Sequence, residues 1–299
     1  MTIRLHIDTD GGVDDAIALT AIARSGVRIE SVSAVFGNTW VDQAASNARW
    51  VLGLSHCGPE VYVGAARGLA DRAVVRHRPG HGEDGMNGAG GSRRRRLPPL
   101  ERPHGVSVIA QAARNGVTGL FLGPLTNLAR ALLEDPRAMR GWSPVAMAGA
   151  FEVQGQGQGG VDFNTWSDPE ALRRVLLAGV MPRLVTLDAT SQVRLRLEAF
   201  EAASVQTSSP LFQKLYQAAG PYAEHHARTW GGEGCRPHDA VAAGPVLWPE
   251  LYEFTAAFIV PDPEHPGRLS RTEGAPNALV CVNLDAAEVE KRLLAALFG

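Results

Sequence analysis

Four aspartates lie close together near the N-terminus: Asp8, Asp10, Asp14 and Asp15. The first two end a short apolar run typical of a β-strand, where a period of two points both carboxylates to one side. The last two begin a segment with a helical pattern. Acids are favoured at a helix start, which explains one or two of them but not four. Four carboxylates at one turn repel each other unless a cation neutralises them. Oxygen ligands alone select a hard ion such as Ca²⁺ or Mg²⁺, so the sequence predicts a metal site.

The remaining apolar runs predict the scaffold that positions this turn. Short strand-like runs are Leu5 to Thr9, Ile29 to Phe36, Gly119 to Leu122, Pro144 to Ala148 and Arg183 to Leu187. Helix-like segments are Asp14 to Arg24, Val41 to Leu52, Gly105 to Asn115, Thr126 to Glu134, Asp168 to Ala178 and Ala240 to Val246. This alternation predicts one α/β domain over residues 1–299, with a mainly parallel Rossmann-like sheet flanked by helices. Ligands of such sheets bind beyond the carboxyl ends of the strands, where the acidic turn lies.

Two segments interrupt the alternation. One is Gly64 to Pro103, rich in Gly, Arg and Pro, and the other is Ser204 to Pro237, with a helix-like stretch inside it. Long excursions from a compact domain are either functional lids or disordered, and the sequence leaves both open.

Composition narrows the class of ligand. The chain has 299 residues, 45% of them hydrophobic, and 29 Lys and Arg against 31 Asp and Glu, for a formal charge of -2. This balance favours a small neutral ligand over nucleic acid or an anionic membrane. We find no signal peptide pattern and no apolar stretch long enough to span a bilayer. Cys57, Cys235 and Cys281 form no Cys-x-x-Cys pair, so we expect reduced thiols and a cytoplasmic location.

A series of short motifs along the chain resembles one known family. The acidic stretch fits Asp-x-Asp-x-x-x-Asp-Asp, the N-terminal signature of the inosine-uridine preferring nucleoside hydrolases. Further similar motifs follow in family order: Gly37-Asn38, His81-Gly-Glu-Asp-Gly85, Gly123-Pro-Leu-Thr-Asn127, Phe163-Asn164 before Asp168-Pro-Glu170, and His238-Asp239-Ala240. The resemblance implies the nucleoside hydrolase fold with inserted active-site loops, and a dimer or tetramer. It also implies hydrolysis of the N-glycosidic bond of a ribonucleoside to ribose and free base.

The resemblance implies a role for each matching residue. Ca²⁺ would be held by Asp10, Asp15, the Thr126 carbonyl and Asp239, with Asp10 also the general base for a water. The ribose would be bound by Asp14, Asn38 and Asn164, while Asp8 would support the loop. The base end would be lined by His81 and by His238, the candidate acid for the leaving group. In the second inserted segment are Tyr222, His225, His226 and Trp230, which would either lie on the surface or, as the resemblance implies, close over the base. These residue types suit a reaction that needs an activated water, negative charge near the sugar and help for the departing base.

Two positions depart from the family pattern. Gln156 and Asp162 stand where family members commonly carry an Asn and a Glu that contact the 5′ end of the ribose. One side chain is longer by a methylene and the other shorter, so we expect the pair to govern that end as a coupled unit. Two explanations remain open. The site binds the same sugar in a slightly shifted position, or the natural substrate is altered at its 5′ carbon.

Two further stretches invite other readings. Gly155 to Gly160 spells Gly-x-Gly-x-x-Gly, but we expect no helix after it, so it is interpreted as a flexible loop and not a dinucleotide site. Arg93 to Arg96 form a basic run, typical of a solvated loop and less often of a phosphate site.

Two other functions compete with nucleoside hydrolysis. Asp8-Thr-Asp10-Gly11 also begins the nucleophile loop of haloacid dehalogenase-type phosphatases, with Asp8 attacking phosphorus, although Gly12 stands where a Thr is expected. A non-catalytic riboside-binding homologue would keep the metal and lose turnover. The sequence leaves the preferred base open.

Overall fold

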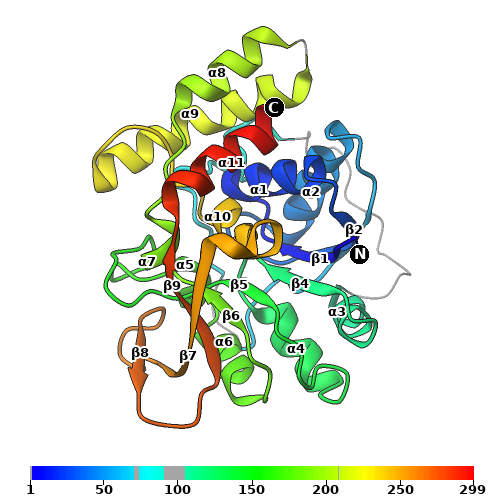
Figure 1. Cartoon of the computed structure of the whole chain (residues 1–299), viewed down its shortest axis with the longest axis vertical. Helices are drawn as coiled ribbons and strands as arrows, with labels where there is room; N and C mark the ends of the chain where they lie inside the picture. The colour runs from blue at the N-terminus through cyan, green and yellow to red at the C-terminus, as the bar shows by residue number, and fades with distance from the viewer. Residues whose placement is uncertain (1, 71–73, 91–104, 208) are drawn as a thin grey trace.

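One nine-stranded sheet runs through the computed structural model, which describes residues 2–70, 74–90, 105–207 and 209–299 (Figure 1). Its strands are β1 (Arg4–Thr9), β2 (Arg28–Ala34), β3 (Glu60–Val63), β4 (Thr118–Phe121), β5 (Val145–Met147), β6 (Arg183–Val185), β7 (Tyr252–Pro261), β8 (Leu269–Thr272) and β9 (Ala278–Leu284). Their order is β3-β2-β1-β4-β5-β6-β9-β7-β8. The sheet is parallel from β3 to β9, and β7 and β8 add an antiparallel edge. The predicted, mainly parallel α/β sheet is confirmed.

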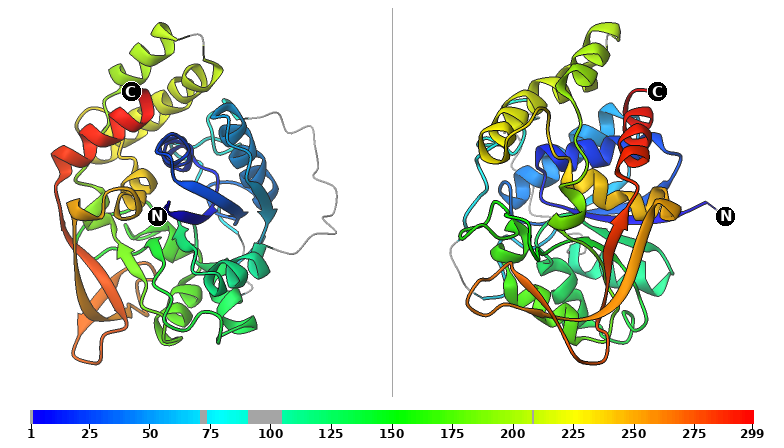
Figure 2. Two further views of the ribbon diagram at one scale, coloured as in Figure 1. Left: turned by 45° about the vertical axis from the view of Figure 1, so that its right-hand side comes forward. Right: turned by 60° about the vertical axis from the view of Figure 1, so that its left-hand side comes forward.

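Helices cover both faces of the sheet (Figures 1 and 2). One face carries α1 (Val13–Arg24), α2 (Val41–Leu54), α10 (His238–Leu247) and α11 (Ala286–Phe298). The other carries α3 (Gly105–Arg114), α4 (Thr126–Glu134) and α6 (Pro169–Leu177). Short helices α5 (Phe163–Ser167) and α7 (Leu187–Thr190) follow β5 and β6. Two separate hydrophobic clusters therefore form, one on each face of the sheet.

Helix α1 is enclosed on nearly all sides. It contacts α2, α10 and α11, and every residue from Val13 to Ile22 is buried. It follows β1, the strand at which the order of the sheet reverses, since β2 lies on one side of β1 and β4 on the other. Loops leaving neighbouring strands part at such a reversal and open a crevice. The acidic turn between β1 and α1 is therefore placed in the crevice with no solvent behind it.

The inserted segments differ from each other. The stretch from Ser204 to Pro237 is mostly helical: α8 (Leu197–Gln206) and α9 (Pro210–Trp230) form a hairpin, and α9 packs on α1 and α2. In the first insertion, residues 64–70 and 74–90 contain no helix or strand after β3, and Arg93 to Arg96 lie outside the described residues. The second insertion is thus an ordered, packed part of the fold.

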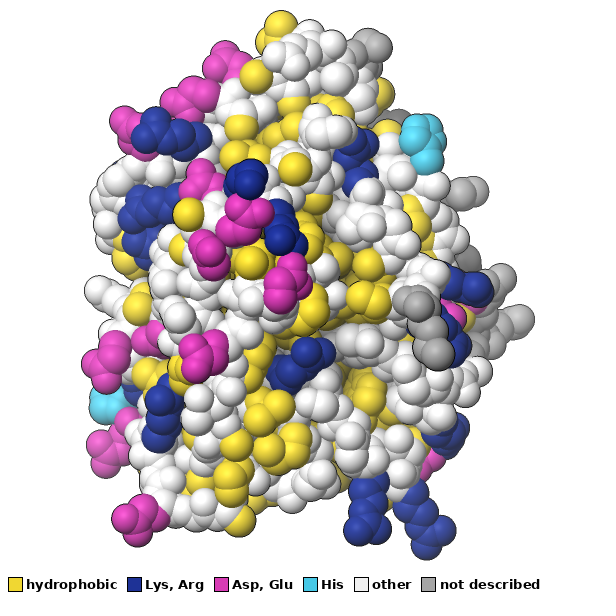
Figure 3. Space-filling model, viewed as in Figure 1, with side chains coloured by type: hydrophobic (Ala, Val, Ile, Leu, Met, Phe, Trp, Pro, Cys, Tyr) yellow, Lys and Arg dark blue, Asp and Glu magenta, His cyan; other side chains and the backbone are white. Residues whose placement is uncertain are grey.

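One face of the molecular surface carries charged side chains of both signs (Figure 3). Acidic and basic side chains lie interspersed on the face seen in Figure 3, so neither sign dominates there. Within the described ranges, no helix is long and apolar enough to cross a membrane. The three cysteines are unpaired, as expected.

Asn127 joins the ends of several strands beneath the crevice. Its Nδ2 donates to Asp8 Oδ1 at 2.7 Å and to the Ala34 carbonyl at 3.0 Å, and its Oδ1 accepts from the Ala65 amide at 2.8 Å. Asn127 is fully buried, so water cannot replace these partners. The side chain therefore connects β1 and β2 to the chain after β3 and to the start of α4.

We expect Asn127→Ala to lower the free energy of unfolding by about 2 to 4 kcal/mol, because it leaves buried polar groups without partners. Chemical denaturation measures the change, with the exposed Asn115→Ala as matched control. Equal stability of the two variants would show that the Asn127 contacts contribute little.

Candidate active site

The turn between β1 and α1 holds Asp15 and Asp14 at the start of the helix. The carboxylate of Asp15 accepts hydrogen bonds from the Gly12 amide at 2.7 Å and from the Thr9 hydroxyl. Gly11 has a φ of 73°, and a Cβ there would lie 2.5 Å from the Ala44 Cα. The turn therefore requires glycine, and its tightness brings the helix start directly onto the strand end.

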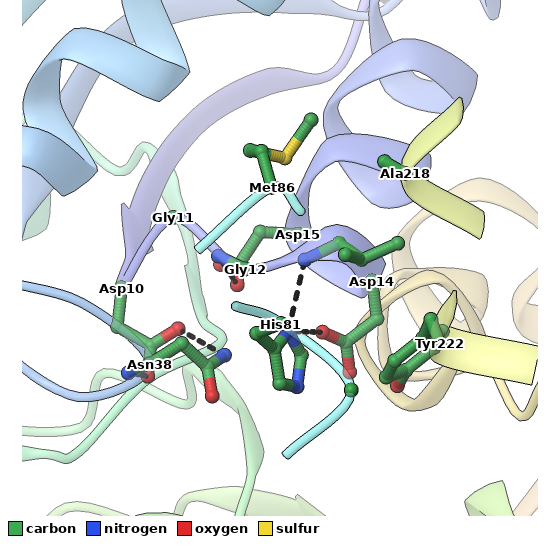
Figure 4. Close-up of polar contacts among 12 residues, drawn as sticks. Asp10, Gly11, Gly12, Asp14, Asp15, Asn38, His81, Met86, Ala218 and Tyr222 are labelled. Atoms are coloured by element: carbon green, nitrogen blue, oxygen red, sulfur yellow. Dashed lines mark hydrogen bonds and ion pairs between the residues drawn. The ribbon is translucent and has the colours of Figure 1, made fainter. Parts of the chain in front are cut away.

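Asp10 is held by Asn38, the residue predicted beside it at the end of β2. Its Oδ2 accepts from the Asn38 backbone amide and its Oδ1 from Asn38 Nδ2, both at 2.9 Å (Figure 4). A Cβ on Gly37 would collide with the Asp10 carboxylate, so the close approach of the β2 loop depends on that glycine. With its NH₂ group committed to Asp10, Asn38 keeps its amide oxygen for a ligand.

Asp239, in the first turn of α10, completes the cluster. Oxygens of Asp14, Asp15 and Asp239 all lie within 4.8 Å of one another, a spacing that could hold a metal ion. Asp14 Oδ1 is buried and has no hydrogen-bond partner. No Lys or Arg forms an ion pair with these acids among the pairs found in the described chain. Three unneutralised carboxylates with oxygen-only donors fit a hard divalent cation.

The pKa values of the cluster show the cost of this arrangement. Burial, followed by the charge of Asp15, raises the pKa of Asp14 to about 7 and that of Asp10 well above its usual range. Burial also raises the pKa of Asp239, and the charges of Asp14, Asp15 and Asp10 add to the effect. The carboxylate of Asp10 therefore interacts electrostatically with that of Asp15 and belongs to the same cluster. A cation at this point would remove the repulsion.

Asp8 lies behind the cluster and does not line the pocket. Its Oδ1 accepts from the Ser33 hydroxyl and from Asn127, and it is fully buried. His6 Nε2 lies 3.0 Å from the same Ser33 oxygen. These hydrogen bonds connect β1 to β2 and to α4, as expected of a residue that supports the loop from behind.

A pocket of about 480 Å³ opens above the acids. Its lining includes ten predicted residues: Asp14, Asn38, His81, Gln156, Asp162, Asn164, Tyr222, Trp230, His238 and Asp239. Asp10 and Asp15 are fully buried beside it. Asn164 donates its NH₂ group to the Leu122 carbonyl at 2.7 Å and to the Met147 carbonyl at 3.1 Å, which leaves its amide oxygen for a ligand.

The imidazoles of the pocket are buried and neutral. His81 Nδ1 accepts from the Val13 amide at 3.1 Å and lies 4.0 Å from Asp14 Oδ1 (Figure 4). The His81 ring also packs on Tyr222, with ring centroids 4.9 Å apart. His238 Nδ1 lies 2.7 Å from the Thr190 hydroxyl. Burial lowers the pKa of both rings, that of His238 to about 3. Each ring therefore has one nitrogen committed to the protein and one left for a ligand.

Three predicted residues have contacts that the sequence did not indicate. Asp162 lines the pocket, but its Oδ2 caps α5 by accepting from the Thr165 amide and also binds the Gly149 amide, both at 2.8 Å. Gln156 contacts His226, which does not itself line the pocket. Gln156 and Asp162 thus have different protein partners.

Thr126 begins α4, as predicted, and its hydroxyl donates to Asp168 at 2.6 Å.

The Gly155 to Gly160 stretch forms a turn closed by a bridge from Gly157 to Val161. The expectation that no helix follows it was wrong, because α5 begins at Phe163. No strand leads directly into the stretch, since β5 ends at Met147, so it remains unlike a dinucleotide loop.

Sequence reasoning missed several residues of the pocket: His77, Leu122, Met147, Gln154, Phe163, Leu187 and Ser191. His77 stacks on Phe163, with ring centroids 5.0 Å apart, and its Nε2 is buried without a partner. His77 lies in a loop without periodicity or motif, so only proximity to His81 in the sequence could have indicated it. Trp230 lines the pocket, whereas its neighbour His225 does not.

Comparisons with known proteins agree with this geometry. The family model described as inosine-uridine preferring nucleoside hydrolase matches residues 5–291. The chain is 33% identical over 270 residues to an uncharacterized protein of Schizosaccharomyces pombe, covering 84% of this chain and 82% of the relative. It is 30% identical over 268 residues to the non-specific ribonucleoside hydrolase RihC of Salmonella paratyphi A, covering 87% and 84%.

Among solved structures, the purine-preferring ribonucleoside hydrolase from Gardnerella vaginalis has the same fold. It superposes with a TM-score of 0.89 at 22% identity, covering 99% of this chain and 98% of that one. The acidic crevice, the order of the sheet and the match along nearly the whole sequence lead to one assignment. The chain belongs to the inosine-uridine preferring nucleoside hydrolase family.

Proposed function

We propose that this chain hydrolyses the N-glycosidic bond of ribonucleosides, giving ribose and free base, with Ca²⁺ bound by Asp10, Asp15, the Thr126 carbonyl and Asp239. The observation that supports it best is the buried group of Asp14, Asp15 and Asp239, which has no neutralising cation of its own. When bound, a divalent cation lowers the pKa of a water and orients a vicinal diol. Asp10 would also be the general base that accepts the proton of that water.

The sugar would be held by groups with free acceptor atoms. Asp14 has an unpartnered oxygen, and Asn38 and Asn164 have committed their NH₂ groups to the protein. Three acceptors around one pocket suit a ribose, whose hydroxyls donate. Negative charge at the same place stabilises the oxocarbenium character that develops in glycosidic cleavage.

The departing base would receive help from His238. Its Nδ1 is oriented by Thr190, so Nε2 is the nitrogen available to donate toward the base. His81 and Tyr222 would form the adjacent wall.

RihC is named a non-specific ribonucleoside hydrolase, and we propose a similarly broad acceptance of bases here. A homodimer or homotetramer is proposed as well, to be measured by light scattering.

The phosphatase alternative fits poorly. A nucleophilic Asp8 would have to reach the pocket, but its carboxylate is buried against Ser33 and Asn127. The non-catalytic riboside-binding alternative is separated from the hydrolase by one assay: release of reducing sugar from a panel of purine and pyrimidine ribosides, with and without chelator. Binding without release would favour it.

Removing divalent ions should lower the melting temperature by several degrees, and Ca²⁺ should restore it, because the buried carboxylates then repel each other. Thermal denaturation of chelator-treated protein with added Ca²⁺ measures this. Asp15→Asn should lose the response, whereas the exposed Asp42→Asn should keep it. An unchanged melting temperature in the parent would contradict a metal at this site.

Asp10→Asn should lower kcat by roughly a hundredfold or more, since the base for the water is lost. Riboside affinity should change less, because Asn38 and Asn164 remain. Single-turnover kinetics and calorimetric binding separate the two effects. Turnover near the parental rate would show that Asp10 is not the base.

His238→Ala should slow nucleosides more than p-nitrophenyl riboside, whose leaving group departs without a proton. Thr190→Val, which removes only the partner of His238, should give a smaller loss in the same direction. The Ca²⁺-dependent melting shift should persist, as a check that Asp239 is undisturbed. Equal losses on all substrates would assign His238 to packing.

A further inference from the structure

Gln156 and His226 form a polar contact at the end of the pocket away from the acids. His81 contacts Asp14, Tyr222 packs on His81, and His226 packs on Tyr222 with ring centroids 4.1 Å apart. His226 Nε2 lies 3.1 Å from the Gln156 carboxamide. His226 is 1% exposed and does not line the pocket, and Gln156 is a pocket residue to which its Nε2 comes within hydrogen-bond distance.

The hydrogen bonds of His226 determine which ring nitrogen carries the proton. The backbone N–H of Arg236 donates to His226 Nδ1 at 2.9 Å, so Nδ1 is the acceptor. Burial lowers the pKa of this imidazole, which is therefore neutral. A neutral imidazole has one N–H, so His226 Nε2 must be the donor toward Gln156. Tyr222 and Trp230 pack against the ring, at 4.1 and 4.9 Å, and oppose its reorientation.

The donor on His226 in turn fixes the carboxamide of Gln156. The structure has the Gln156 NH₂ nitrogen 3.1 Å from His226 Nε2, which would place two donors against each other. A 180° turn of the carboxamide puts the carbonyl oxygen there instead and satisfies the contact. The other end of the carboxamide is buried and has no hydrogen-bond partner. With the carbonyl on His226, that unpartnered end is the NH₂ group, and it belongs to a residue that lines the pocket.

We propose that His226 is a positioning residue that holds the Gln156 carboxamide with its NH₂ group toward the pocket, so that the site selects ribosides offering a hydrogen-bond acceptor there. The inference rests on the proposed function, and the resemblance to the family implies that the 5′ oxygen of the sugar lies at Gln156. A second hollow shares Gln156, His77 and Phe163 with the pocket, so a small group on that oxygen has room. The 5′ oxygen is selected as an acceptor and tolerates a substituent.

Four matched ribosides test the direction of this hydrogen bond. They carry at the 5′ carbon a hydroxyl, a methyl ether that only accepts, an ammonium that only donates, or hydrogen. We expect the ether to keep most of the kcat/KM of the hydroxyl, and the ammonium and deoxy compounds to lose roughly tenfold. Dissociation constants with Ca²⁺ present should follow the same order.

Variants of His226 separate positioning from packing. In Gln, the terminal nitrogen is three bonds from Cβ, like Nε2 of His; in Asn, it is two bonds away, like Nδ1. His226→Gln should therefore keep the tenfold preference for hydroxyl over deoxy, whereas His226→Asn and His226→Phe should reduce it to within about twofold. Glu224→Gln, exposed on the same helix, should behave as the parent.

Variants of Gln156 test the donor itself. Gln156→Leu should abolish the preference, and Gln156→Glu, whose carboxylate only accepts, should reverse it toward the ammonium compound. Melting temperatures confirm that each variant is folded, and the ratio between substrates is independent of the amount of active protein.

Three results would overturn the inference. They are a parent that prefers the ammonium compound over the ether, full discrimination in His226→Phe, and equal behaviour of His226→Gln and His226→Asn. Binding of the panel replaces turnover if the parent binds ribosides without cleaving them, which would refute the proposed function alone. A parent that neither binds nor cleaves any riboside would refute both.

Discussion

Repulsion among buried carboxylates is the constraint on which the rest of the site depends. Asp14 and Asp15 are carried into the interior because α1 is enclosed by α2, α10 and α11, and Asp239 meets them from α10. No hydrophobic gain comes from placing these charges together, and their raised pKa values record the cost. Such an arrangement persists only where the surrounding fold is stable enough to impose it, and it becomes favourable when a cation is bound.

The fold offsets part of that cost with backbone and amide donors. Asp10 accepts two hydrogen bonds from Asn38, and Asp15 accepts one from the Gly12 amide at the positive end of α1. These donors also fix where each carboxylate points. The same contacts that make the charges tolerable therefore fix the oxygens in an arrangement that could hold a metal ion.

Much of the fold and the acidic half of the site could be predicted from the sequence, because local patterns determine them. The strand before Asp8 and the helix from Val13 have clear periodicity, and the acids occupy adjacent positions between them. Strands β7, β8 and β9 were not predicted, since strand pairing at the end of the chain depends on distant partners. His77 and the contact between Gln156 and His226 were missed for the same reason: residues 70 positions apart meet only in the folded chain.

The two ends of the pocket are thus built by different physical means. The acidic end is formed by one strand-helix turn with Asn38 and Asp239. Removing the charge of any one carboxylate there changes the electrostatic repulsion on the others. The opposite end includes a hydrogen-bonded contact between a loop and α9, formed by the neutral side chains of Gln156 and His226. A substitution there leaves the number of buried carboxylates unchanged. The departure from the family at Gln156 falls at this end, where the structure can accommodate it.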